Sequence, residues 1–231
     1  MSRQLPLSLG LQHAPSLDDF VVGRNQTLIE VLRHSLDPTG EPVLYIFGPS
    51  GCGRSHLLLG QCAQAEQRGL RCAYLALNDH AKLAPGILDG LETLDLLAFD
   101  DIQLIAGDSD WEEALFALFN RCRDRGTRML FSADCGPAAS PIQLPDLRSR
   151  LAWGLSLSIQ PLDDQGRLEL LQSLATRRAL SLPSDVARYL LERTSRNPSD
   201  LVDTISRLDH ASLAEQRRLT IPFVRDSLKL S

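Results

Sequence analysis

Residues 48–55 (GPSGCGRS) have the residue types and spacing of a phosphate-binding loop. They fit the pattern G-x-x-x-x-G-K-[ST] at every fixed position except one, where Arg54 replaces lysine. The glycines allow a curled backbone whose N–H groups face an anion, and a helix that follows adds its positive end. The Ser55 hydroxyl can ligate Mg²⁺. An ordinary glycine-rich turn is disfavoured, because the flanking elements, the serine and two downstream aspartates all agree with phosphate binding.

Those two aspartates, Asp100 and Asp101, directly follow an apolar run at residues 94–99 (LDLLAF). In proteins with a phosphate-binding loop, one acid at such a position holds Mg²⁺ and another orients the attacking water. We therefore predict that Asp100 is a metal residue and Asp101 a catalytic one. Paired aspartates alone would be a weak signal, because aspartate often caps helices, but after a phosphate-binding loop the signal is strong.

Arginine at position 54 changes what the loop can do. Lysine acts on phosphates as a compact point charge, whereas the guanidinium group is bulkier, planar and forked. It still attracts phosphate but does not serve a γ-phosphate in the same way. We therefore expect nucleotide binding with slow hydrolysis by this chain alone. The residues do not distinguish a diphosphate from a triphosphate.

Short apolar runs alternate with helical stretches, which predicts a doubly wound α/β sheet that carries the loop at a strand end. Strands are expected at residues 43–47, 72–77, 94–99 and 128–133, and a fifth at 154–159. Helices are expected at residues 26–36, 55–67 and 111–123. The segment WEEALFAL within the last of these is typical of an amphipathic core helix rather than a partner site.

Beyond Pro161 the pattern becomes entirely helical. Helices are predicted at residues 163–178, 185–193 and 198–214, with a short one near Pro222, and with Ser184 and Asn197 as N-caps. The predicted organisation is therefore a tail at residues 1–16, an α/β nucleotide-binding domain at 17–161 and a small all-helical domain at 162–231.

Composition narrows the classes of function. The 231 residues carry a net charge of −5, which disfavours a protein that grips duplex DNA through its phosphates. The five cysteines form no C-x-x-C pair, which indicates reduced thiols rather than disulfides or zinc. Neither a signal peptide nor a membrane span is recognisable, so we expect a cytoplasmic protein.

Several segments resemble the DnaA-related AAA+ family. They are FVVGRN (20–25), GRSHLL (53–58), DDIQLIAG (100–107), FSAD (131–134), LRSRLAWGL (147–155) and LTIPFVRDSLKL (219–230). The arginine in GRSHLL is similar to the Hda branch of that family. The resemblance implies an AAA+ fold, in which a P-loop parallel sheet with flanking helices precedes a small C-terminal helical lid.

The resemblance also implies ligands and site residues. It implies an adenine nucleotide with Mg²⁺, an arginine finger at Arg150 and a sensor-one residue at Asp134. Trp153 stands beside Arg150 in the sequence, and we expect it to be structural and to help hold the finger loop. The implied nucleotide-binding residues are Val21, Val22, Pro49, Ser50, Gly51, Cys52, Gly53, Arg54, Ser55, His56 and Asp134. The implied metal residues are Ser55 and Asp100. For His56, a helix-packing role is the alternative. The sensor-two arginine of DnaA falls on Ser199, which weakens any claim of efficient hydrolysis, although Arg196 stands nearby.

Residues 4–9 (QLPLSL) resemble the Q-L-x-L-x-[LF] peptide by which replication proteins dock on the β sliding clamp of DNA polymerase III. Apolar side chains of such an extended segment enter a groove while the glutamine hydrogen-bonds at its edge. The implied clamp-binding residues are Gln4, Leu5, Leu7 and Leu9. Packing of the tail on its own domain is the alternative.

Together these features indicate a regulator of the DnaA initiator. A clamp-bound adaptor would use Arg150 to stimulate hydrolysis of DnaA-bound ATP and so prevent re-initiation. The resemblance includes no DNA-binding domain, so no direct sequence-specific DNA binding or membrane association is expected; a homodimer stays open. One alternative is an AAA+ ATPase of the helicase-loader type that uses its own site. Another is a nucleotide-independent scaffold, which the intact phosphate loop opposes.

Overall fold

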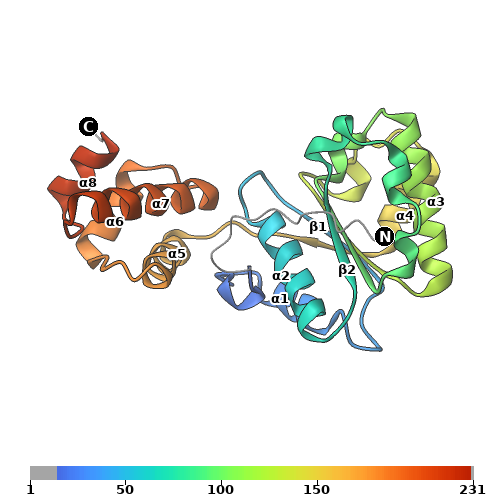
Figure 1. The fold of residues 1–231 in the computed structure, drawn as a ribbon, viewed down its shortest axis with the longest axis horizontal. Helices are drawn as coiled ribbons and strands as arrows, with labels where there is room; N and C mark the ends of the chain where they lie inside the picture. The colour runs from blue at the N-terminus through green and yellow to red at the C-terminus, as the bar shows by residue number, and fades with distance from the viewer. Residues whose placement is uncertain (1–14, 230–231) are drawn as a thin grey trace, which may run out of the picture.

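Five short strands form one parallel sheet in the computed structural model, which describes residues 15–229 (Figure 1). The strands are β1 (Val43–Phe47), β2 (Cys72–Ala76), β3 (Leu96–Asp100), β4 (Arg128–Ala133) and β5 (Leu155–Ser158). Their order in the sheet is β2-β3-β4-β1-β5, and all four pairings are parallel. Strands β1, β3 and β4 are almost entirely buried, which explains their continuous apolar sequences.

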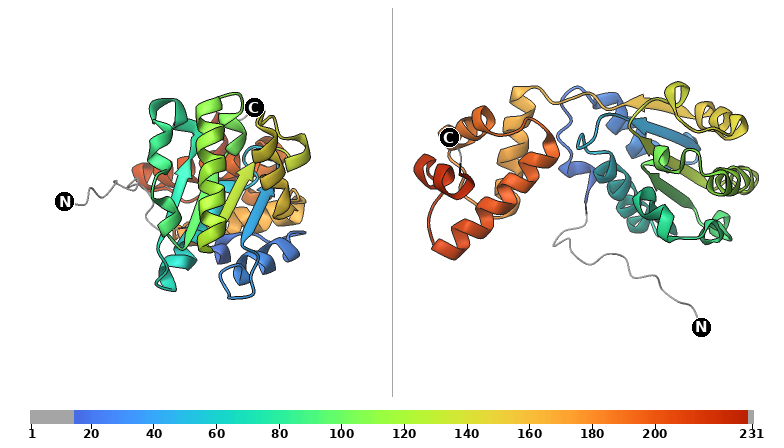
Figure 2. Two further views of the ribbon diagram at one scale, coloured as in Figure 1. Left: turned by 90° about the vertical axis from the view of Figure 1, so that its right-hand side faces the viewer. Right: turned by 90° about the horizontal axis from the view of Figure 1, so that it is seen from above.

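Helices cover both faces of this sheet (Figures 1 and 2). On one face, α1 (Gln26–His34) and α2 (Arg54–Gln67) enclose an aliphatic core. On the other, α3 (Ser109–Arg125) and α4 (Pro145–Trp153) enclose a core that contains Phe99, Phe119 and Phe131 in stacked contact. Burying each of these rings contributes roughly 1.5–3 kcal/mol. The loop between β1 and α2 is therefore fixed by well-packed elements on both sides.

Short 3-10 turns make most of the remaining connections. They are η1 (Leu17–Asp19), η2 (Leu77–Lys82), η3 (Pro85–Leu88), η4 (Leu91–Thr93), η5 (Ile102–Ile105) and η6 (Pro137–Ala139). Three of them, η2 to η4, replace a crossover α-helix between β2 and β3. Within residues 15–229, no helix is both long and apolar enough to cross a membrane.

The last four helices build a second domain with its own apolar core (Figure 1). These helices are α5 (Asp164–Arg177), α6 (Ser184–Arg193), α7 (Pro198–Glu215) and α8 (Ile221–Leu228). Val21 from the first domain and Leu162, just before α5, pack against this core, and Arg177 forms an ion pair with Asp19 at 2.9 Å. The helical lid is therefore seated beside the segment that leads into α1.

The fold class expected from the sequence is confirmed, with local differences. Asp100 is the last residue of β3 rather than the residue after it. Helix α4 was not predicted at all, and the expected loop around Arg150 is helical instead. Ser184 is not the N-cap of α6, because Pro183 occupies that position and Ser184 is already helical. Asn197 is confirmed as the N-cap of α7, since its side chain accepts from the Ser199 N–H at 3.1 Å.

Candidate functional site

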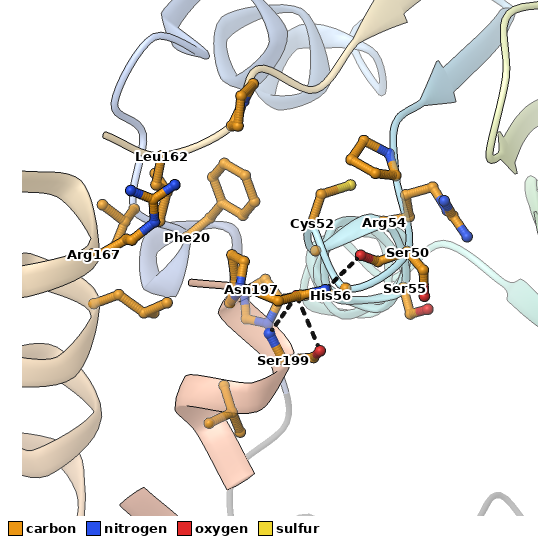
Figure 3. Close-up of a pocket in the computed structure, with 18 of the residues that line it drawn as sticks. Phe20, Ser50, Cys52, Arg54, Ser55, His56, Leu162, Arg167, Asn197 and Ser199 are labelled. Carbon is orange, nitrogen blue, oxygen red and sulfur yellow. Dashed lines mark hydrogen bonds between the residues drawn. The ribbon is translucent and has the colours of Figure 1, made fainter. Parts of the chain in front are cut away.

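A cavity of about 620 Å³ lies over the phosphate-binding loop, between the sheet domain and the helical lid (Figure 3). The loop follows β1 and leads into the N-terminus of α2, where unpaired backbone N–H groups and the helix dipole favour an anion. Of the nucleotide-binding residues predicted from the sequence, the cavity lining contains Val21, Pro49, Ser50, Gly51, Cys52, Gly53, Arg54, Ser55 and His56. Asp101 also lines it.

Two loop glycines have backbone conformations and surroundings that exclude a side chain. Gly51 and Gly53 have φ angles of +76° and +105°, in the left-handed region that favours glycine. A Cβ atom on Gly53 would lie 2.9 Å from the Phe20 ring. One on Gly51 would lie 2.1 Å from the Asn197 side chain. The curled backbone of the loop therefore depends on glycine at both positions.

Arg54 does not reach toward the lid but turns back onto its own domain. Its side chain points away from Asn197 in Figure 3, and the residue is only 9% exposed. The guanidinium group donates to the Gly48 carbonyl and forms an ion pair with the Asp101 carboxylate. The cation of the loop is thus already paired with the acid that the sequence predicted to orient water.

Asp100 lies deeper, beneath the cavity rather than in its lining. The residue is 3% exposed, and both carboxylate oxygens accept hydrogen bonds from hydroxyl groups. The donors are Tyr74 at 2.6 Å and Ser132 on the neighbouring strand β4. Burial, together with the hydrogen bond to Asp100, raises the pKa of Tyr74 above its usual range, so this hydroxyl stays protonated and donates.

The lid reaches the loop through a polar side chain. Asn197, at the start of α7, donates from Nδ2 to the Ser50 carbonyl at 2.9 Å (Figure 3). The neighbouring Ser199, on which the resemblance places the sensor-two position, lines the cavity and brings no charge. Arg196 also lines the cavity, but its side chain is 68% exposed and lies 3.9 Å from Asp164. The contact between Asn197 and the loop was not predicted, because a helix cap in the sequence does not indicate its distant partner.

Arg167 is a second lid cation that the sequence analysis missed. Its side chain is 16% exposed, lines the cavity and bonds Asp164 at 2.7 Å and the Arg196 carbonyl at 3.0 Å. In Figure 3 it lies near Leu162 and Phe20, on the apolar side of the cavity. The cation is therefore fixed on the lid side of the cavity by its bonds to Asp164 and Arg196.

His56 combines the two roles considered for it. Its Nε2 atom lies 3.0 Å from the Ser16 carbonyl, and its ring is 6.2 Å from that of Phe20. Burial lowers the pKa of His56, so the neutral ring can donate from Nε2. The histidine thus fastens the segment before α1 to α2 while it also lines the cavity.

Val22 and Asp134 lie outside the cavity lining. Val22 packs against the aliphatic core beneath α1 and α2. The Asp134 side chain is exposed just beyond β4, and Ser132 from the same strand end contacts Asp100 instead. Burial raises the pKa of the Cys52 thiol, so this loop cysteine is not an activated thiolate.

Arg150 lies on α4, outside the lining of the cavity over the phosphate-binding loop. Leu147 and Leu151 anchor the helix in the core. The buried Glu112 carboxylate also holds the entry to α4 by accepting from the Leu144 N–H at 2.6 Å. Arg150 is partly exposed and has no ion pair or side-chain hydrogen bond within residues 15–229. A core-anchored helix therefore presents, at the surface, a guanidinium group that is unpaired among the described residues.

Trp153 lies one helical turn after Arg150 and is 58% exposed. The expectation that this indole supports the arginine from within the structure is therefore wrong. Residues three apart on a helix share a face, so the two side chains are neighbours on one surface. The buried side chains of Leu147 and Leu151, not Trp153, anchor α4 in the core.

Solved structures share this architecture. Domain III of the replication initiation protein DnaA from Thermotoga maritima superimposes with a TM-score of 0.81 at 24% identity, covering 93% of this chain and 95% of that one. AMPPCP-bound DnaA from Aquifex aeolicus gives a TM-score of 0.73 at 26% identity, covering 87% of this chain and 66% of that one. The Thermotoga maritima RuvB Holliday junction branch migration motor gives 0.72 at 18% identity, covering 93% and 71%.

Family comparisons then define the class. A family model described as the bacterial DnaA ATPase domain matches residues 11–158. With its parallel sheet, phosphate loop and helical lid, the chain belongs to the bacterial DnaA ATPase family of AAA+ proteins. A second family model, described as the Hda lid domain, matches residues 164–228. The chain is thus a DnaA-related AAA+ protein of the Hda type.

Proposed function

We propose that this chain is a clamp-recruited regulator that inactivates the DnaA initiator by stimulating hydrolysis of DnaA-bound ATP. The observation that carries the proposal is the placement of Arg150. It is unpaired within the described residues, fixed on α4 and absent from the lining of its own cavity. A guanidinium group in that position can stabilise negative charge on a nucleotide held by a neighbouring AAA+ domain.

In this proposal the chain's own cavity holds an adenine nucleotide as a structural ligand. The loop supplies backbone donors, and Phe20 and Leu162 supply apolar surface. The Mg²⁺ expected at Ser55 and Asp100 does not fit the residues as they are arranged. Asp100 is buried outside the cavity lining, and both of its oxygens accept hydrogen bonds from protein hydroxyls.

Replacing Gly53 with valine is expected to abolish binding of adenine nucleotide. The new side chain would clash with Phe20 and force a left-handed backbone that a β-branched residue does not adopt. Isothermal titration calorimetry with ADP and ATP measures the effect. Gly69→Ala is the matched control, because Gly69 also has a positive φ but a Cβ there meets nothing within 4 Å. Wild-type affinity in Gly53→Val would contradict nucleotide binding at this loop.

A helicase-loader type of ATPase that acts through its own turnover is the alternative function. The Arg54–Asp101 ion pair opposes it, because the acid predicted to orient water is held by the loop arginine. The neutral Ser199 at the sensor-two position opposes it as well. Phosphate release by the chain alone, and with DnaA and clamp-loaded DNA, separates the proposals. A regulator releases no phosphate when it is incubated alone, whereas a loader hydrolyses ATP by itself. A nucleotide-independent scaffold keeps its effect on DnaA when Gly53 is replaced by valine.

The surface around Arg150 is proposed to contact DnaA, and Trp153 is expected to contribute to that contact. Large aromatic side chains that are exposed in a free protein are frequent anchors of interfaces, where loss of one costs on the order of 2 kcal/mol or more. Trp153→Ala should weaken binding of DnaA by roughly 30-fold. Biolayer interferometry with immobilised ATP–DnaA measures this, and the melting temperature should stay unchanged because the indole is mostly in solvent.

The control for that measurement is Leu213→Ala on α7, which removes another exposed apolar side chain, 70% in solvent, from the lid. It should leave DnaA affinity at the wild-type level. Equal losses in the two variants would show that Trp153 has no specific role.

Recruitment is proposed to occur through residues 4–9, which lie outside the described residues and before the matched DnaA ATPase segment. The β sliding clamp on DNA is the proposed binding partner of this segment.

We propose a cytoplasmic location for the chain, because its proposed partners act on DNA. Self-association into a homodimer is a separate proposal, and the mass of the purified chain by light scattering tests it.

A further inference from the structure

We propose that this pocket binds its nucleotide without a divalent cation, and that Asp101 competes with the nucleotide phosphates for the Arg54 guanidinium group. The inference rests on the proposal that adenine nucleotide occupies the cavity. It goes further by naming the form of the ligand, a metal-free nucleotide, and an internal competitor that sets its affinity.

A metal ion at this nucleotide would need a carboxylate ligand, and Asp100 is the predicted one. The Asp100 carboxylate is 3% exposed and accepts from the Tyr74 and Ser132 hydroxyl groups, one on each oxygen. Mg²⁺ requires near-ideal octahedral oxygen ligands and is usually held by one or two carboxylates together with phosphates.

Asp101, by contrast, does line the cavity. Its Oδ1 atom is paired with Arg54 and also accepts from the Gln103 side chain at 3.1 Å. Its backbone N–H donates to the Ser132 hydroxyl at 2.9 Å, and its φ is +59°. Of the predicted metal residues, only the neutral Ser55 hydroxyl faces the cavity. Ser55 and Asp101 together are a poor site for a divalent cation, because the Asp101 carboxylate charge is already compensated by the Arg54 guanidinium group.

The Arg54 guanidinium group supplies the positive charge that a metal ion would otherwise bring. The Arg54 side chain is 10% exposed, so its ion pair with Asp101 is screened less than a surface pair would be. The guanidinium group has five N–H donors, and its contacts to Gly48 and Asp101 do not use them all. A bound phosphate can therefore accept hydrogen bonds from the Arg54 guanidinium group, but it competes with the Asp101 carboxylate for that group. Removing the carboxylate charge should favour the phosphate.

The first test measures ADP binding by isothermal titration calorimetry in EDTA and again in excess Mg²⁺. The wild-type dissociation constants are expected to agree within about threefold, which corresponds to roughly 0.6 kcal/mol. Arg54→Lys should restore a metal dependence, because a lysine ammonium lacks the fork that holds both Gly48 and Asp101. A wild-type chain that binds ADP at least tenfold more weakly in EDTA would overturn the proposal.

The second test is Asp101→Asn, measured in EDTA. Affinity for ADP is expected to rise on the order of tenfold, because the charge-assisted bond that competes with phosphate is lost. Asparagine tolerates the left-handed conformation at this position, so the variant should fold. The control is Asp124→Asn, which removes an exposed carboxylate paired with Arg123 at the end of α3 and should change nothing.

The outcomes distinguish this inference from the proposal beneath it. No ADP binding by the wild-type chain with or without Mg²⁺ overturns both. Binding that needs Mg²⁺ overturns the metal-free part of the proposal. An Asp101→Asn affinity equal to or below that of the wild type overturns the competition for Arg54. Both results leave nucleotide binding intact.

Discussion

Arg150→Ala is expected to remove most of the stimulation of DnaA-bound ATP hydrolysis while the protein keeps its fold and its nucleotide. The guanidinium group makes no ion pair or side-chain hydrogen bond within the described part of the chain that its loss would disrupt. An arginine finger supplied in trans accelerates hydrolysis by ~10³–10⁵, which equals roughly 4–7 kcal/mol of barrier. A surface ion-pair partner would be worth only ~0–1 kcal/mol. The two roles therefore differ by orders of magnitude in rate.

The matched control is Arg148→Ala, two residues earlier on the same helix, where another exposed arginine is removed. It should retain near-wild-type stimulation. Arg150→Lys should rescue poorly, because lysine keeps the charge but loses the planar fork. The readout is the rate at which ATP–DnaA becomes ADP–DnaA in the presence of clamp-loaded DNA. A near-wild-type rate with Arg150→Ala would refute the finger assignment and favour the loader-type alternative.

Combined replacement of Gln4, Leu5 and Leu7 by alanine is expected to abolish binding to the β sliding clamp. These residues are the matched positions of a docking peptide, and anchor residues of that kind each contribute on the order of 2 kcal/mol or more. They precede the segment matched to the DnaA ATPase domain, so the melting temperature should hardly change. Surface plasmon resonance on immobilised clamp measures the affinity.

Ser8→Ala is the control within that segment, since position 8 is not fixed by the motif. It should bind the clamp like the wild type. Retention of clamp binding by the triple variant would instead favour a tail that packs on its own domain.

Local sequence patterns predicted the sheet well because its signals are local. The run VLYIF gave β1 with both ends correct, since a continuous apolar segment before a glycine-rich loop can only be buried. The order of the strands in the sheet was not predicted, because pairing partners are distant in sequence. Helix α4 was missed although Pro145 and Asp146 are typical of a helix start, because its short apolar face gives a weak periodicity.

The site was predictable in its residues but not in their contacts. The glycine spacing identified the loop, and the chemistry of arginine indicated weak hydrolysis. The Arg54–Asp101 ion pair joins residues on α2 and after β3 and depends on how the sheet aligns them. The Asn197–Ser50 hydrogen bond joins two domains. The exposure of Trp153 could not be read from its type, because tryptophan is found both in cores and at interfaces.

The central claim is that this chain acts on the ATP of another protein. The most direct test incubates DnaA carrying radiolabelled ATP with this chain and clamp-loaded DNA, and follows conversion of the bound nucleotide to ADP. We predict rapid conversion only when both the chain and the clamp-loaded DNA are present, with negligible turnover by the chain without DnaA. A conversion rate equal to that of DnaA alone would contradict this claim. Hydrolysis of free ATP by the chain without DnaA, at the rate seen with DnaA, would contradict it as well.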